Sequence, residues 1–204
     1  MSASVRPITL ADVAVPRPGL AHHVLLVVGA SVFTALAAQL EVRLPFTPVP
    51  LTGQTFAVLL TGALLGARRA FLAQLLYLAE GCAGLPVFSG GGAGAAHLIG
   101  PTGGYLLSFP FAAAAVGALA SRGWDRRFVT MLAAMLLGSV VVFACGLAGL
   151  ARFVPANALL ATGLLPFVPG DLVKSTLAAI AFPAVWHRLP QEPRDERRTG
   201  ARTF

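Results

Sequence analysis

The sequence predicts an all-α integral membrane protein, a compact bundle of six transmembrane helices in a single domain. Of the 204 residues, 56% are hydrophobic, and the mean hydropathy is +0.78. Only 11% are charged, whereas soluble domains average about 25%. The apolar residues also gather into six segments, separated by basic or turn-forming connections. These three observations place the chain in a membrane.

Each apolar segment is expected to form one helix. The expected ranges are 22–40, 53–67, 69–84, 102–121, 128–150 and 170–187. The first follows a long polar lead-in, which favours a retained helix over a cleaved signal peptide. The second and third span about 23 Å at 1.5 Å per residue, less than the roughly 30 Å of a hydrocarbon core. Short spans of this kind often border a cavity in transporters.

The arginines predict the orientation of the bundle. The two terminal segments and the connections after the second and fourth helices hold Arg6, Arg17, Arg68, Arg69, Arg122, Arg126, Arg127, Arg188, Arg194, Arg197, Arg198 and Arg202. The remaining connections hold only Arg43 and Arg152. Because basic residues concentrate in cytoplasmic connections, both termini are expected in the cytoplasm. The expected parts are a cytoplasmic tail at 1–21, the bundle at 22–187 and a basic cytoplasmic tail at 188–204.

The three connections expected outside are rich in Pro, Gly, Phe and Leu and poor in charge. They read "EVRLPFTPVPLTG", "LPVFSGGGAGAAHLIGPTGG" and "RFVPANALLATGLLPFVPG". Non-helical backbone near membrane depth must line a cavity or be buried in protein. The density of turn formers therefore favours outer loops that form a lid over the bundle. The alternative is that they lie flat in the membrane interface as amphipathic caps.

The last apolar segment carries an acid, Asp171, and a base, Lys174. The two are about 300° apart around a helix and so share a face. Since an ionisable residue inside a membrane is costly, it indicates a functional site by default. The alternative is a pair that neutralises itself and binds nothing else. Further polar side chains are expected at the same outer level, namely Gln54, Thr55, Tyr77, Glu80 and Tyr105.

The sequence lacks the motifs of nucleotide-binding, metal-binding and catalytic sites. "GDLVKST" has Val173 where a phosphate loop requires glycine before its lysine, and no strand precedes it. No nucleotide site is therefore expected in this chain, so uphill transport would need a partner ATPase or an ion gradient. Neither Cys82 nor Cys145 belongs to a metal-binding pattern, and no metal is expected. Catalytic motifs are missing too, although an intramembrane enzyme using Glu80 and Asp171 as acid and base stays an alternative. A purely structural bundle is another.

The first helix carries a stripe of small residues, Ala30, Thr34 and Ala38. Small residues at this spacing allow two helices to approach closely. The stripe could pack inside the bundle or dock a partner subunit, and the sequence leaves the two alternatives open.

Three sequence blocks, in this order, point to a known family: "PFTPVPLTGQT", "GLPVFSGGG" and "GPTGGY". Together with the later "PGDLVKS" they make residues 22–187 resemble the BioY family. These proteins are the biotin-specific substrate-binding (S) components of energy-coupling factor (ECF) transporters. The resemblance implies a multi-pass protein of the bacterial cell (inner) membrane that captures biotin from outside. It also implies partners, namely a transmembrane coupling protein and two cytoplasmic ATPases, which would use the ATP.

The resemblance assigns roles to several residues. It implies that Asp171 and Lys174 belong to the biotin site and that Ala30, Thr34 and Ala38 dock the partner. Biotin's ureido ring has two N–H donors for Asp171 and an oxygen that Lys174 can bind. The remaining ligand contacts are expected from Gln54, Tyr77, Glu80, Phe88 and Tyr105, with Phe46 as a further wall. The biotin carboxylate would bind either to Lys174 or to backbone amides of the Gly-rich loop, and the sequence does not decide between them. A transporter of biotin or a related small molecule that works without ATPase partners is the functional alternative.

Overall fold

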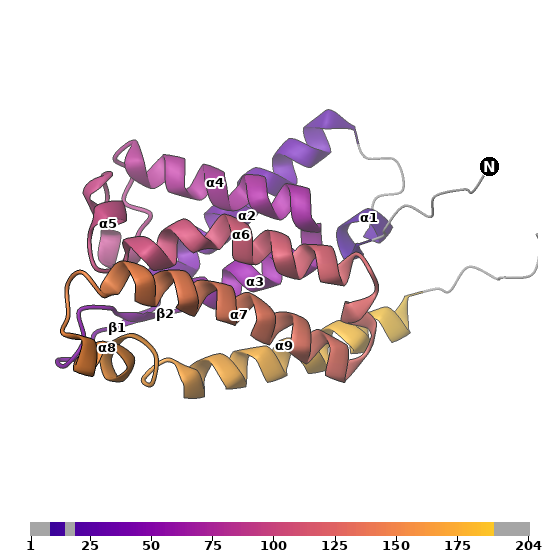
Figure 1. Ribbon diagram of the computed structural model, residues 1–204. Coiled ribbons are helices and arrows are strands. Elements are labelled where there is room, and N and C mark those ends of the chain that lie inside the picture. The colour runs from indigo at the N-terminus through magenta and orange to yellow at the C-terminus, as the bar shows by residue number, and fades with distance from the viewer. Residues whose placement is uncertain (1–8, 15–18, 190–204) are drawn as a thin grey trace, which may run out of the picture.

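The computed structural model describes residues 9–14 and 19–189, and most of the predicted tails lies outside these ranges. Within them the chain is almost entirely helical (Figure 1). The helices are α1 (Leu10–Ala14), α2 (Leu20–Gln39), α3 (Gln54–Leu65), α4 (Ala67–Cys82), α5 (Ala96–Ile99), α6 (Gly103–Ala120), α7 (Phe128–Leu150), α8 (Ala156–Gly163) and α9 (Val168–Arg188). Two short strands, β1 (Glu41–Val42) and β2 (Leu51–Thr52), pair antiparallel, and η1 (Ser89–Gly91) and η2 (Trp124–Arg126) are single 3₁₀ turns.

Every segment that was predicted to be helical forms a helix, namely α2, α3, α4, α6, α7 and α9. Four stretches of the described chain are long and apolar enough to cross a membrane: Leu20–Gln39, Gly103–Ala120, Phe128–Leu150 and Ala156–Arg188, which joins α8 to α9. In contrast, α3 has 12 residues and α4 has 16. The two short helices follow each other directly, because Gly66 adopts φ 79° and turns the chain between them. Only glycine adopts such an angle at little cost.

The centre of the bundle is α6, which packs against α3, α4 and α7, while α2 packs on α4 and α9 on α7 (Figure 1). Small residues let these helices approach. Ala112, Ala113 and Val116 of α6 are fully buried. A Cβ atom on Gly62 of α3 would lie 2.5 Å from the carbonyl oxygen of Ala113. At Gly62 the backbone of α3 therefore lies directly against the backbone of α6. Small residues permit this close packing between membrane helices.

The bundle has two unlike ends (Figure 1). One carries β1, β2, η1, α5 and α8 and is called here the loop end; the other carries α1, η2 and the last turn of α9 and is called the terminal end. At the loop end the connections bind each other across the bundle. Thr47 Oγ1 donates to the Thr162 carbonyl at 2.7 Å, and the Gln39 side chain bonds to Phe88 O at 3.2 Å and to Gly91 N at 3.1 Å. These bonds fold the connections over the end of the bundle.

The small-residue stripe of α2 lies inside the bundle. Ala30 is 7% exposed, and Thr34 and Ala38 are fully buried. Gln74 of α4 is buried beside them and donates to Thr34 Oγ1 at 3.0 Å and to Thr61 Oγ1 at 3.1 Å. The predicted docking role of Ala30, Thr34 and Ala38 therefore needs correction, because these positions pack against α4 and present no free face. The sequence could not decide between packing inside the bundle and docking a partner subunit, because both require small residues at these positions.

The terminal end is held by two side-chain links. Arg69 Nη2 lies 2.5 Å from Asp12 Oδ1 and so ties α1 to the start of α4. Trp186 of α9 donates its indole N–H to Asp125 Oδ2 at 2.5 Å, and the Arg126 guanidinium lies 4.6 Å from the centre of the Trp186 ring. The second link joins the last turn of α9 to the connection between α6 and α7.

The buried carboxyl at the terminal end predicts a pH effect on stability. Asp125 is fully buried, and its Oδ1 has no hydrogen-bond partner within the described residues. Burial raises the pKa of Asp125, although the Trp186 bond and Arg126 oppose this. A carboxyl whose pKa is higher in the folded than in the unfolded state is stabilising when protonated, so its contribution falls as the pH rises through the folded pKa.

We therefore compare the wild-type protein with Asp125→Asn. The melting temperature of the wild type minus that of the variant is expected to fall between pH 4 and pH 7, by about 3–5 °C for each unit by which the pKa is raised. Thermal unfolding in detergent at several pH values measures it. Trp186→Phe, which removes the opposing bond, should make the fall larger. A difference that stays constant or rises with pH would contradict the assignment.

Candidate functional site

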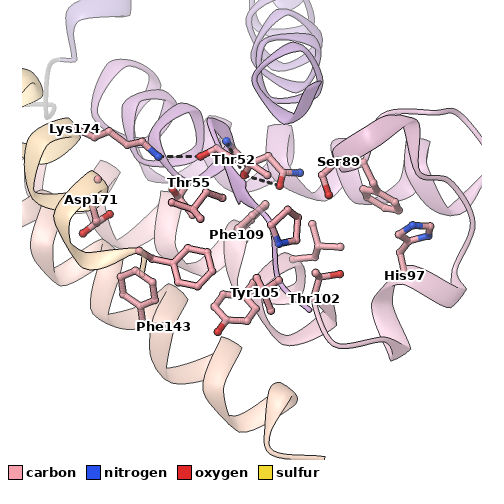
Figure 2. A pocket seen from close by; sticks show the side chains of 18 residues that line it. Thr52, Thr55, Ser89, His97, Thr102, Tyr105, Phe109, Phe143, Asp171 and Lys174 are labelled. Carbon is pink, nitrogen blue, oxygen red and sulfur yellow. Dashed lines mark hydrogen bonds between the residues drawn. The ribbon is translucent and has the colours of Figure 1, made fainter. Parts of the chain in front are cut away.

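A cavity opens at the loop end of the bundle, between α3, α6, α7 and α9 (Figure 2). It encloses about 720 Å³ of space free of protein atoms, including the part open to solvent. Residues of all three long connections line it, from Val49 in the first, through Ser89 in the second, to Phe167 in the third. The connections thus cover and line the cavity as a lid does, and caps lying flat in the interface would not.

Asp171 and Lys174 lie at one end of this cavity, on the first turns of α9 (Figure 2). Asp171 is 9% exposed and accepts a hydrogen bond from Ser139 Oγ of α7 at 2.9 Å. Lys174 Nζ donates to the Thr52 carbonyl at 2.8 Å. No ion pair joins the two within the described residues. Each group is instead hydrogen-bonded to a different neighbour, which does not fit a pair that binds nothing else, and each keeps bonding capacity for a ligand.

Gln54 lines the cavity at the start of α3, and Tyr77 supports it from behind. Gln54 Nε2 donates to Tyr77 Oη at 2.5 Å, and Tyr77 Oη donates to the Val87 carbonyl at 3.0 Å. Tyr77 is fully buried, and its ring packs edge-on against Phe88 with centroids 5.6 Å apart. Tyr77 is not among the lining residues. Its predicted role as a direct contact is thus corrected to that of a residue that positions Gln54 and Phe88.

Glu80 lies outside the site. Its carboxylate accepts a hydrogen bond from Ser31 of α2, and it does not line the cavity. One turn beyond Tyr77 on α4, it faces the neighbouring helix instead of the ligand space. Phe46 is also outside, with 60% of its surface exposed. Glu80 and Asp171 therefore do not form an acid–base pair in one pocket, which removes the geometry that the enzyme alternative requires.

Phe88, Tyr105 and Thr55 line the cavity. Phe88 is almost completely buried, and Tyr105 donates its hydroxyl to the Gly163 carbonyl at 2.7 Å, which ties α8 to α6. The Tyr105 ring fits because Gly146 of α7 has no side chain there.

Further lining residues were not predicted from the sequence. They include Ser89, His97, Thr102, Phe109, Phe143 and Phe167. Ser89 belongs to "GLPVFSGGG", and Thr102 belongs to "GPTGGY", so these two blocks could have indicated them. Phe143 and Phe167 sit in apolar stretches where no pattern sets them apart from residues that face lipid.

The geometry describes a pocket with aromatic walls and few polar groups. Asp171 is the one carboxylate and Lys174 the one ammonium among the described lining residues. An acceptor and a donor one helical turn apart, each with bonding capacity left beyond its one bond to the protein, suit a ligand group that carries both an N–H and an oxygen. The walls from Phe88, Tyr105 and Phe109 suit an apolar body attached to it.

Comparison with known proteins identifies the family. Residues 6–191 match the sequence profile of the BioY family. The chain belongs to the BioY family. Among its relatives, the probable biotin transporter BioY of Pyrococcus horikoshii is 41% identical over 160 residues, which cover 78% of this chain and 93% of that protein. The biotin transporter BioY of Rhizobium etli is 36% identical over 178 residues, covering 83% and 95%.

A solved structure shares the fold of this BioY-family chain. It is the S-component for biotin from an ECF-type ABC transporter, and it superposes with a TM-score of 0.71 at 26% identity. The match covers 83% of this chain and 93% of the other. The family resemblance expected from the three sequence blocks is thereby confirmed, and the relatives are named as transporters and not as enzymes.

Proposed function

We propose that this chain is the substrate-binding component for biotin of an ECF-type transporter. One observation carries the proposal: a chain of the BioY family folds around a lidded pocket in which Asp171 and Lys174 offer an acceptor and a donor beside aromatic walls. The ureido ring of biotin has two N–H donors and one carbonyl acceptor, and its thioether ring and valeryl chain are apolar. The relatives and the solved structure are named for the same ligand.

The protein spans the bacterial cell membrane six times, through α2, α3, α4, α6, α7 and α9. The distribution of arginines supports cytoplasmic termini, because it puts the terminal end of the bundle inside and the loop end outside. The pocket then opens to the outside, where biotin is captured. The two short helices α3 and α4 cross within a bundle whose longer members match the hydrocarbon thickness.

The partners are a transmembrane coupling protein and two cytoplasmic ATPases, and the ATP of the transport cycle is hydrolysed by them. The naming of the solved relative as a component of an ABC transporter supports such partners. Since Ala30, Thr34 and Ala38 are buried, docking in this conformation would use other residues.

The first test is biotin binding by the purified chain in detergent, measured by isothermal titration calorimetry. We expect one site with a dissociation constant below about 1 µM, or better than about −8 kcal/mol. Desthiobiotin keeps the ureido ring and serves as a related ligand, whereas thiamine lacks it and is the negative control. A chain that binds no biotin, or binds thiamine equally well, would contradict the proposal.

Uptake of labelled biotin separates the two modes of transport. In cells that contain the coupling proteins, this chain is expected to raise uptake, and the increase should disappear when the ATPases carry inactivating mutations. Uptake that persists without any coupling protein would support the alternative, a transporter that works without ATPase partners.

A further inference from the structure

The cavity has a second polar end, away from Asp171 and Lys174. His97, Ser89 and Thr102 line it there, and Figure 2 shows His97 across the cavity from the charged pair, with Tyr105 and Phe109 between them. We infer that His97 binds the carboxylate of the ligand, so that biotin lies with its ureido ring at α9 and its acid at the Gly-rich loop. The inference rests on the proposed function and adds the orientation of the ligand and a residue that determines specificity.

The surrounding loop holds the imidazole in place. Its ring centre lies 5.4 Å from that of Phe88, and a Cβ atom on Gly92 would come within 2.5 Å of Nε2, so glycine is needed for this approach. The bond from Phe88 N to Gly92 O, at 3.0 Å, closes the loop around the ring. The His97 side chain is therefore positioned before any ligand arrives.

Nδ1 of His97 is buried and has no hydrogen-bond partner within the described residues. Buried polar atoms in native proteins nearly always have a partner, so the protein alone does not account for this orphaned nitrogen on a residue that lines the cavity. The Ser89 and Thr102 hydroxyls lie in the same wall and can donate as well. Several donors with no acid among the lining residues at this end suit a carboxylate.

The other end of the cavity is a poor place for a second carboxylate. The charge of Asp171, one helical turn from Lys174, would repel an acid placed there. Near the Gly-rich loop the acid Glu41 lies against Gly90, but Arg43 pairs with it at 2.8 Å and offsets its charge. Charge and bonding capacity thus favour the ureido ring at α9 and the acid at His97.

The test compares biotin with its primary amide, which keeps the rings and chain but has no carboxylate. Calorimetry on the full purified chain gives both dissociation constants for the wild type, His97→Phe and His97→Ala. The wild type should prefer biotin by about 10- to 100-fold, the value of one or two bonds to a charged group. Both variants should lose that preference because their affinity for biotin alone falls. Their affinity for the amide should stay within about threefold of wild type.

Two matched variants complete the design. His187→Leu removes an exposed histidine at the terminal end and should leave both affinities unchanged. Lys174→Met should lower the affinity for both ligands and keep the preference for biotin over its amide. The inference is overturned if the wild type binds biotin and amide equally, if the His97 variants weaken both ligands alike, as a purely structural role predicts, or if Lys174→Met removes the preference. Failure of the wild type to bind biotin at all would instead contradict the proposed function.

Discussion

Asp171→Asn and Lys174→Met are each expected to weaken biotin binding by about 100-fold or more. Removing one partner of a buried, charged hydrogen bond costs about 2–5 kcal/mol, partly because the other partner is left unpaired. Asp171 is 9% exposed and already oriented by Ser139, so its free oxygen has a defined direction. Lys174 is oriented by the Thr52 carbonyl. Because both side chains are already ordered, the ligand does not lose binding free energy to ordering them.

Calorimetric titration of each variant with biotin measures the effect, and two variants of the same type outside the pocket are its controls. Glu80→Gln changes an acid that contacts α2, and Arg152→Met changes an exposed base in a connection at the loop end. Both controls should stay within about threefold of wild type. Affinities unchanged in Asp171→Asn and Lys174→Met would show that the ligand binds elsewhere, and a large loss in Glu80→Gln would restore the direct role that the sequence predicted for Glu80.

Neutralising both charges together separates a binding site from a structural bundle. The structural alternative predicts that Asp171→Asn combined with Lys174→Met keeps or raises the melting temperature and that the chain has no ligand to lose. We expect the double variant to fold, since two costly buried charges are removed, yet to bind no measurable biotin. Thermal unfolding with and without biotin distinguishes the two, because only a bound ligand raises the melting temperature.

Gly62→Val is expected to cause the largest loss of stability, about 2–4 kcal/mol. The added Cβ would lie 2.5 Å from the Ala113 carbonyl oxygen and 3.2 Å from Val116 Cβ, both on α6. Backbone atoms of a packed helix cannot rotate away as a flexible side chain can. The two helices would have to separate at the centre of the bundle, where Ala113 and Val116 are fully buried.

Gly29→Val on α2 is the matched control. No atom lies within 4 Å of a Cβ built on Gly29, so this helical glycine has open space around it. Its replacement should change the free energy of unfolding by no more than about 0.5 kcal/mol. Melting temperatures in detergent, or the fraction of monodisperse protein after heating, give the comparison. Equal stability of the two variants would mean that α3 and α6 are not in backbone contact.

Much of the candidate site could be predicted because its polar residues are exceptional in an apolar chain. Asp171 and Lys174 stand out in any membrane segment, and Gln54 and Tyr105 lie at helix ends beside distinctive blocks. His97 could be seen in the sequence but not assigned, because a histidine in a Gly-rich connection has no periodicity to orient it. Glu80 was misplaced because its distance along α4 fitted the outer level, while its direction around the helix faces α2.

The sequence by itself determined the class of protein, the six helical segments and the contrast between the two ends. Hydropathy and charge are sums over neighbouring residues, so they can be read without knowing which helix touches which. Tertiary structure alone decided that the stripe of Ala30, Thr34 and Ala38 faces α4. It also decided that Asp171 and Lys174 bind separate partners and that His97 lines the cavity. Each of these depends on the rotation of a helix or the path of a loop, and packing between distant segments sets both.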